Sequence, residues 1–190
     1  MTFWRQRLVL IVRAVLRHET PASGEDFEQL NPIIFERQRL RPWSEVLAES
    51  DQAYADLFTV TDQLSDDELT AFNHFDWIPD GDPLYTVFMG NCYEHAQQHF
   101  AQYALDRHDL PQALGIYEIW AERVVQAEVP DELKRIVLYN LACFYSIHAE
   151  LGKAATTLRQ ACTRYPQLKE MARTDADLIA LRSALPEAFT

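Results

Sequence analysis

Hydrophobic residues in the N-terminal part of the chain recur at helical spacing. The first set lies at i, i+4, i+7, i+8 and i+11 and consists of Trp4, Leu8, Ile11, Val12 and Val15. This spacing predicts an amphipathic helix over residues 3–18. A second long helix is predicted to start at Arg41-Pro42-Trp43, because proline suits the first turn of a helix. Its predicted apolar face comprises Val46, Leu47, Tyr54, Leu57, Phe58 and Leu64.

The segments between and after these two helices are predicted to form shorter elements and a loop, followed by a third long helix. Residues 27–34 are expected to form a short helical or irregular crossing. Ser65 and Glu68 have the spacing of a capping box, which predicts the start of a short helix. A loop over residues 73–81 follows, and its Trp77 has the best claim among the tryptophans to line a pocket. Asp82-Pro83 is then predicted to cap a third long helix that runs to about residue 106.

The character of the chain changes at residues 108–111, where we expect a domain boundary. Beyond it, helical spacing predicts a helix over residues 112–127, a break at 128–131, and two helices over 132–148 and 151–164. The last two are expected to turn near Leu151-Gly152, Pro166 to close the second, and residues 174–177 to cap a final helix. The predicted fold class is therefore all-α, with domains at residues 1–108 and 109–190.

Composition and charge narrow the classes of function. The interval between Arg41 and Arg107 holds thirteen Asp and Glu and no Lys or Arg, and such a surface repels phosphate backbones, so no nucleic-acid binding is predicted. The apolar run from Leu8 to Val12 is far shorter than the roughly 20 residues that span a membrane, so no membrane partner is predicted. Three cysteines without close spacing indicate reduced thiols and a cytoplasmic protein.

One stretch of the second domain resembles a tetratricopeptide repeat, in which large and small apolar residues follow a fixed order over two helices. The matching positions are Leu138, Leu141, Ala142, Tyr145, Ala154, Leu158, Ala161 and Pro166. The preceding helix, with Ala113, Tyr117 and Trp120, looks like the second half of a degenerate repeat, and residues 168–181 resemble the terminal cap of such arrays. The resemblance implies helical hairpins that bury their faces against one another or against a partner.

The first domain is similar to most of a DinB-like four-helix bundle. The similarity rests on Trp4, Asp26-Phe27, Asn31, residues 42–47, Leu64-Ser65 with Glu68-Leu69, and Gly90 to His95 with His99. Members of this family often hold a divalent metal with three histidines from two helices, and some act as thiol-dependent transferases or detoxifying hydrolases. The resemblance implies an up-down bundle that here lacks the family's first helix.

His95 and His99 are the pair of side chains that most suggests chemistry. Residues at i and i+4 share a helix face, close enough to hold one metal ion such as Ni, Zn or Fe. They match the two family ligands of the last bundle helix, whereas the third ligand position falls just ahead of Met1. Glu94 points about 100° away on the helix and is a poor replacement. The pair is therefore expected to be an incomplete metal site.

Two functions follow as expectations, and whether the protein is an enzyme stays open. The first is a DinB-related protein with a tetratricopeptide-like tail, in which the bundle is a degenerate or truncated metal site. The alternative is a non-catalytic module for protein–protein interaction with a structural bundle. A bundle without one helix leaves an apolar groove, which predicts a protein partner or self-association. The sequence has no Gly-rich phosphate loop, Gly-x-Ser-x-Gly elbow or His-Glu-x-x-His helix.

Overall fold

The predicted all-α class is confirmed in a computed structural model of the chain. The structure describes residues 2–22 and 27–189, and these form helices, turns and loops with no strand. The chain divides into two compact units, unit 1 (residues 1–96) and unit 2 (residues 97–190). This division falls inside a helix and earlier than the boundary expected at residue 108.

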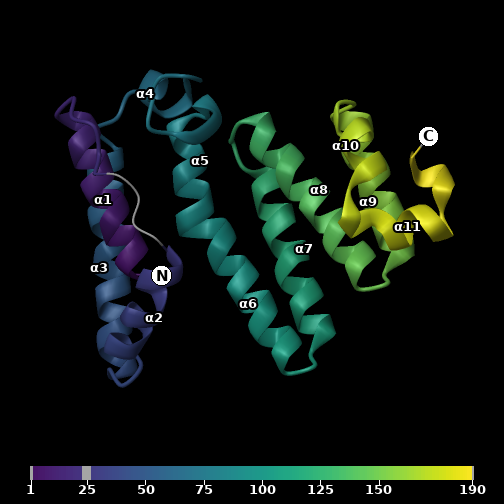
Figure 1. The fold of residues 1–190 in the computed structure, drawn as a ribbon, viewed down its shortest axis with the longest axis horizontal. Helices are drawn as coiled ribbons and strands as arrows, with labels where there is room; N and C mark the ends of the chain where they lie inside the picture. The colour runs from purple at the N-terminus through teal and green to yellow at the C-terminus, as the bar shows by residue number, and fades with distance from the viewer. Residues whose placement is uncertain (1, 23–26, 190) are drawn as a thin grey trace. The chain divides into compact units, whose positions relative to one another are not determined.

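Unit 1 is built on one long pair of helices, α1 and α3, which pack along each other (Figure 1). Its elements are α1 (Thr2–Leu16), α2 (Phe27–Gln38), α3 (Trp43–Thr61), α4 (Asp66–Thr70), the 3-10 turn η1 (Pro79–Gly81), α5 (Leu84–Phe88) and the π-helical η2 (Met89–Glu94). The core joins both long helices to the loop and to α5 through Leu8, Val9, Val12, Val15, Leu57, Val60, Leu64, Ile78 and Leu84. These residues include most of the apolar positions predicted for the first helix.

The start and end signals of unit 1 are mostly correct. The capping box is present in both directions: Glu68 N–H donates to Ser65 Oγ at 3.2 Å, and Ser65 N–H donates to Glu68 Oε2 at 2.8 Å. The crossing is a regular helix, α2, while Asp26 lies outside the described residues. The predicted cap at Asp82 is wrong, because Pro83 occupies the N-cap position of α5 and no side chain caps that helix.

The predicted apolar face of α3 is only partly correct. Leu57 is buried as expected, together with Ala53 and Val60, where the small side chain of Ala53 lets α1 approach closely. Leu47 and Phe58 are exposed instead. The apolar arc of α3 is therefore wider than the surface that α1 covers.

The third long helix of unit 1 is interrupted by the π-helical η2. Such segments insert a residue into the helix and rotate everything that follows. The carbonyl groups around it gain side-chain donors: Tyr54 Oη donates to Cys92 O and Asn91 Nδ2 to Val87 O, both at 2.9 Å. A face drawn along one straight helix from residue 84 to 106 is wrong for this reason.

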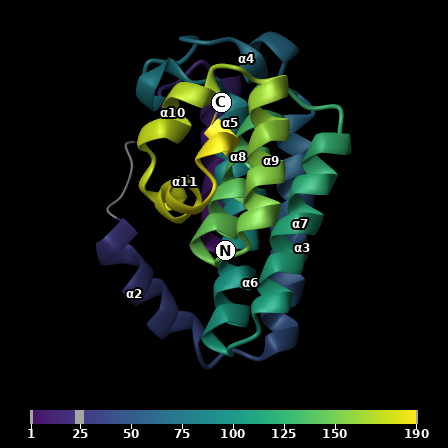
Figure 2. The same cartoon turned by 90° about the vertical axis from the view of Figure 1, so that its right-hand side faces the viewer.

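Unit 2 is a series of helical hairpins (Figures 1 and 2). It comprises α6 (His95–Asp106, from residue 97 on), α7 (Leu110–Gln126), α8 (Asp131–Ile147), α9 (Leu151–Arg164), α10 (Leu168–Thr174), η3 (Ala176–Leu178), α11 (Ile179–Ala184) and η4 (Pro186–Phe189). The helix α8 packs against both α7 and α9. The helices predicted over 112–127, 132–148 and 151–164 are confirmed, although the turn between the last two lies at His148–Glu150.

The hairpins α6–α7 and α8–α9 repeat one pattern of burial at an offset of 41 residues (101 to 142, 113 to 154). Six residues of the first hairpin and their six counterparts in the second are all buried. The equivalent pairs are Ala101 with Ala142, Ala104 with Tyr145, Ala113 with Ala154, Trp120 with Ala161, Ala121 with Cys162 and Val124 with Tyr165.

The two turns have the same geometry at equivalent positions. His108 and Ala149 adopt left-handed φ angles of 59° and 61°. Asp109 N–H donates to Ala104 O, and Glu150 N–H donates to Tyr145 O, each at 2.9 Å. This is the closing bond of a Schellman-type helix end. We call this correspondence in six buried positions and in turn geometry the internal repeat. The turn geometry is not specific to the two hairpins, because α1 ends in the same way, with a φ of 55° at His18 and a bond from Glu19 N–H to Ala14 O at 2.9 Å.

Candidate functional site

The histidine pair lies at the start of α6, directly after the π-helical segment. Both His95 and His99 are exposed and are one turn apart on this helix. π-Helical segments occur frequently at functional sites. The pair therefore directly follows a segment of a kind that is common at functional sites.

The donor set around this pair does not fit a complete metal site. A protein-bound divalent transition metal takes three or four protein ligands. Among the described residues, one group brings three potential ligand atoms within 4.8 Å of one another, and it contains neither histidine. Among the described residues, the two imidazoles therefore have no third metal ligand grouped with them, and an incomplete metal site at this pair stays a prediction.

A polar cavity of about 480 Å³ lies at the opposite end of α1 from Trp4, within unit 1. Trp77 lines it, as expected, together with His18, His74 and Glu68. His74 Nδ1 is 3.6 Å from Asp67 Oδ2, and its ring contacts Phe75 edge-on. Sequence reasoning did not foresee this grouping, because its members come from three separate segments.

Two carboxylates that line this cavity, Glu19 and Glu68, have lowered pKa values, and local hydrogen bonds explain both: the hydrogen bond from Arg17 lowers the pKa of Glu19. The pKa of Glu68 is lowered first by the backbone N–H and the hydroxyl of Ser65, and then by the nearby imidazoles of His74 and His18. The carboxylate therefore works mainly as half of the capping box. The cavity offers polar groups to a ligand but presents no activated nucleophile.

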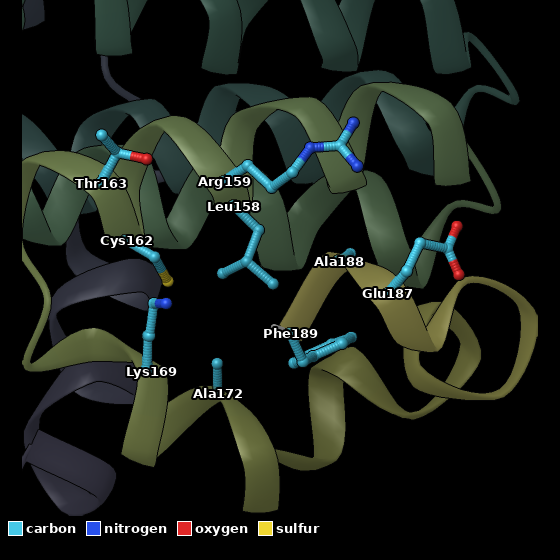
Figure 3. A pocket seen from close by; sticks show the side chains of 9 residues that line it. All are labelled: Leu158, Arg159, Cys162, Thr163, Lys169, Ala172, Glu187, Ala188 and Phe189. Atoms are coloured by element: carbon cyan, nitrogen blue, oxygen red, sulfur yellow. The ribbon is translucent and has the colours of Figure 1, made fainter.

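A smaller cavity of about 180 Å³ lies in unit 2 between α9, α10 and η4 (Figure 3). Leu158, Ala172 and Phe189 form its apolar wall, and the Cys162 thiol and the Lys169 ammonium point into it from one side. Burial raises the pKa of Cys162, and the charge of Lys169 opposes that shift. The thiol is therefore protonated at neutral pH and is a poor nucleophile.

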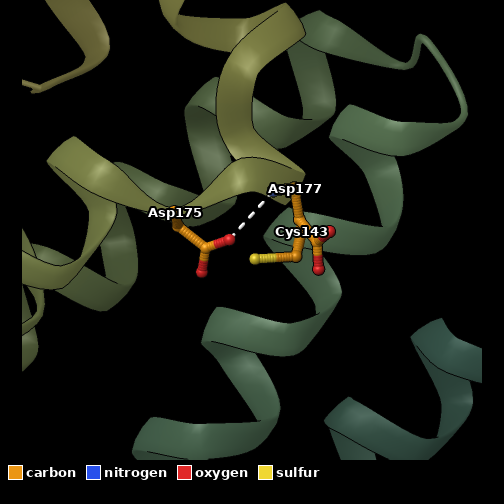
Figure 4. A group of neighbouring side chains, drawn as sticks. All are labelled: Cys143, Asp175 and Asp177. Carbon is orange, nitrogen blue, oxygen red and sulfur yellow. Dashed lines mark hydrogen bonds between the residues drawn. The ribbon is translucent and has the colours of Figure 1, made fainter.

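The group of three potential ligands consists of Cys143, Asp175 and Asp177 (Figure 4). Asp175 Oδ1 accepts from the Asp177 N–H at 2.9 Å, and Asp175 Oδ2 accepts from Tyr139 Oη at 2.7 Å. Burial, together with the two carboxylates, raises the pKa of Cys143 to about 12. Asp175 thus caps η3 and ties it to α8, which is a structural role, and it confirms the predicted cap at residues 174–177.

The faces of α6 and α8 differ although the helices are repeat equivalents. On α8, Leu141 and Phe144 are buried at 7% and 9% exposure, and the Phe144 ring stacks on Tyr117 of α7 with centroids 3.8 Å apart. Their equivalents on α6 are Phe100 and Tyr103, which are 60% and 61% exposed. We call Phe100 and Tyr103 the open face of α6. It is the face on which a helix in the position of α7 would pack.

Comparisons with protein-family models, with curated proteins and with solved structures found no match. Among the described residues, no helix has both the length and the apolar character that crossing a membrane requires.

Proposed function

We propose that this chain is a non-catalytic protein-interaction module that binds an amphipathic helix of a partner on the open face of α6. Unit 2 is then a tetratricopeptide-like array, and unit 1 a DinB-like structural bundle. One observation carries the proposal: Leu141 and Phe144 are buried on α8, where Phe144 stacks on α7, and their equivalents on α6 are exposed aromatic residues. Repeats of this kind bury their faces only against a neighbour.

The internal repeat also describes the helix that the open face would accept. The neighbour of α8 contributes aromatic side chains, since Tyr117 of α7 stacks on Phe144 and in turn contacts Trp120 edge-on. An amphipathic helix with aromatic residues one turn apart would give Phe100 and Tyr103 the same kind of contact. Arg107, whose guanidinium lies 5.5 Å from the Tyr103 ring, would favour acidic residues beside those aromatics.

The experiment is selection from a displayed library of 17-residue amphipathic helices, followed by affinity measurement with the best synthetic peptide. We expect Phe100→Asp and Tyr103→Asp to weaken binding more than about tenfold, because a charge is placed in the apolar contact. Met171→Asp and Ile179→Asp, which alter exposed apolar residues elsewhere in unit 2, should leave affinity unchanged. Failure to enrich any helix, or equal binding by Phe100→Asp, would contradict the proposal.

A second candidate is a DinB-related metal site that has become degenerate, and the π-helical segment before His95 favours it. Its test is the Ni, Zn and Fe content of the purified protein and of His99→Ala, with His108→Ala as the matched control. If the site works, wild type and His108→Ala should carry metal and His99→Ala should not. Equally little metal in all three proteins would exclude the metal function. The proposed compartment is the cytoplasm, which the three free cysteines support.

A further inference from the structure

A further cavity lies wholly within unit 1, between α2 and the N-terminal ends of α1 and α3 (Figure 1). Its volume is about 310 Å³, at the lower end of the roughly 300–1,000 Å³ of cavities that hold small molecules. Aromatic side chains from two helices line it, namely Phe3 and Trp4 from α1 and Phe35 from α2. Aromatic walls favour a flat, ring-shaped ligand.

The two aromatic residues of α1 form one corner of this cavity. The Phe3 and Trp4 rings meet edge-on with their centroids 5.1 Å apart, and Trp4 Nε1 donates to Asn31 Oδ1 of α2 at 3.2 Å. These contacts hold the Trp4 ring in place. Phe35 is different, because it lines the cavity and is still 63% exposed. A ligand ring would cover this side chain and remove apolar area from water.

Four polar side chains that line the cavity form a chain of hydrogen bonds. Gln6 Nε2 donates to Glu49 Oε1 at 3.1 Å. Arg41 Nη1 donates to Glu49 Oε2 and, at 2.6 Å, to Gln38 Oε1. The hydrogen bond from Arg41, and then that from Gln6, lowers the pKa of Glu49, so this carboxylate only accepts hydrogen bonds at neutral pH. A guanidinium only donates, so the network fixes which end of each glutamine amide it uses.

The amide ends that this network leaves over are opposite in kind. Gln6 Oε1 is an acceptor and Gln38 Nε2 is a donor, and neither atom makes a further hydrogen bond within the part of the chain that the structure describes. A ligand that satisfies both ends must carry a donor and an acceptor of its own. Together with the aromatic walls, this requirement describes a flat heterocycle with N–H and C=O groups on its edge, the chemistry of a nucleobase.

The helix α2 can adjust to such a ligand. Among its residues whose side chains the structure describes, none is buried, and the described core of unit 1 contains no residue of α2. Elements that are packed this loosely move at the lowest cost in free energy. A shift of α2 would bring Phe35 and Gln38 closer to a ligand and leave the packing of α1 on α3 intact.

We infer that this cavity binds a nucleobase-like heterocycle. The aromatic rings of Phe3, Trp4 and Phe35 cover the faces of the ligand, and the amides of Gln6 and Gln38 bind its edge. The site lies wholly in unit 1 and does not rest on helix binding by unit 2.

Nuclear magnetic resonance titration with hypoxanthine and with uracil tests the site. The indole N–H signal of Trp4, identified by its absence from the spectrum of Trp4→Phe, should shift and saturate with at least one of them. Anisole, a ring with an acceptor and no donor, is the matched ligand and should bind several-fold more weakly. No saturable shift with either heterocycle, or equal binding of anisole, overturns the inference. Inosine distinguishes the source: tighter binding than hypoxanthine assigns the site to nucleosides and weaker binding to free bases, and both results support a heterocycle site.

Side-chain variants test the two kinds of contact. Phe35→Ala and Gln38→Ala should each raise the dissociation constant several-fold, whereas Phe58→Ala and Gln52→Ala, which alter exposed residues of α3 outside the cavity, should leave it unchanged. Gln38→Glu keeps an acceptor for Arg41 but replaces the donor, so it should weaken binding at least as much as Gln38→Ala. Circular dichroism checks that each variant keeps its helices. Wild-type affinity in Gln38→Glu or in Phe35→Ala contradicts the inference.

Discussion

The helices α6 and α8 are repeat equivalents, yet they differ in what surrounds them. On α8, Leu141 and Phe144 are buried and the Phe144 ring stacks on Tyr117 of α7, while their equivalents Phe100 and Tyr103 on α6 are exposed. The residue classes are the same, so the difference comes from the neighbouring helix and not from the helix itself. This difference is the basis of the proposal that α6 binds a partner helix.

The largest expected difference between α8 and α6 is in how much a truncated side chain lowers the free energy of unfolding. Phe144→Ala should lower the free energy of unfolding by about 3–5 kcal/mol, because it opens a cavity under the stacked Tyr117. The equivalent Tyr103→Ala should change it by less than about 0.5 kcal/mol, since that side chain is largely exposed. Chemical denaturation followed by circular dichroism measures both. Equal costs at the two positions would show that the open face of α6 is buried in solution.

A smaller difference in the free energy of unfolding is expected from a hydrogen bond that α8 makes and α6 does not. Tyr145 Oη donates to Glu118 Oε1 at 2.7 Å, whereas the equivalent residue on α6 is Ala104. Tyr145→Phe should cost about 1 kcal/mol through the lost hydrogen bond, and it keeps the ring in place. The same denaturation experiment applies, and Tyr103→Phe is the control that should cost nothing.

The turns of the two hairpins have the same geometry, so equivalent substitutions in them should have the same effect on stability. His108 and Ala149 both adopt left-handed φ angles, which cost a residue with a side chain about 1 kcal/mol or more. Glycine relieves this strain but adds freedom to the unfolded chain, so His108→Gly and Ala149→Gly should each stabilise by about 0.5 kcal/mol. Thermal unfolding of the two variants should shift upward together; a shift in one alone would contradict the equivalence of the turns.

The smallest expected effect is on acid stability. The pKa of Glu118 is lowered from its usual 4.5, first by the Tyr145 hydroxyl and then by Lys153. A lowered folded pKa means that the carboxylate contributes stability above about pH 4.5 and loses it as the pH falls through the folded value. Denaturation from pH 6 downward should therefore show a shallower loss in Tyr145→Phe than in wild type. An unchanged slope would mean that the hydroxyl does not hold this carboxylate.

Much of the fold follows from local signals in the sequence. Helical spacing predicts α1 and α7 to α9, and Ser65 with Glu68 predicts the start of α4, because each signal depends on a few neighbouring residues. The π-helical segment before His95 was missed, since helical periodicity does not reveal an inserted residue. The sequence also does not predict that Phe58 and Phe100 are exposed, because the burial of a helical residue depends on which helix packs beside it.

The candidate site could be predicted in part. The helical spacing of His95 and His99 places them one turn apart, as the structure has them, while the incomplete metal site stays a prediction. The repeat between α6 and α8 was hidden because Gln97 and Ala104 stand opposite Leu138 and Tyr145, which differ in size and polarity. The match appears only when burial and turn geometry are compared.

Hydrogen exchange with and without a selected amphipathic helix tests the central claim most directly. If the helix packs on the open face of α6, its addition should slow exchange in residues 97–106 and leave residues 136–147 of α8 unchanged, because α8 already packs against α7 and α9. Protection confined to α8, or to unit 1, with no change in residues 97–106 would contradict the account.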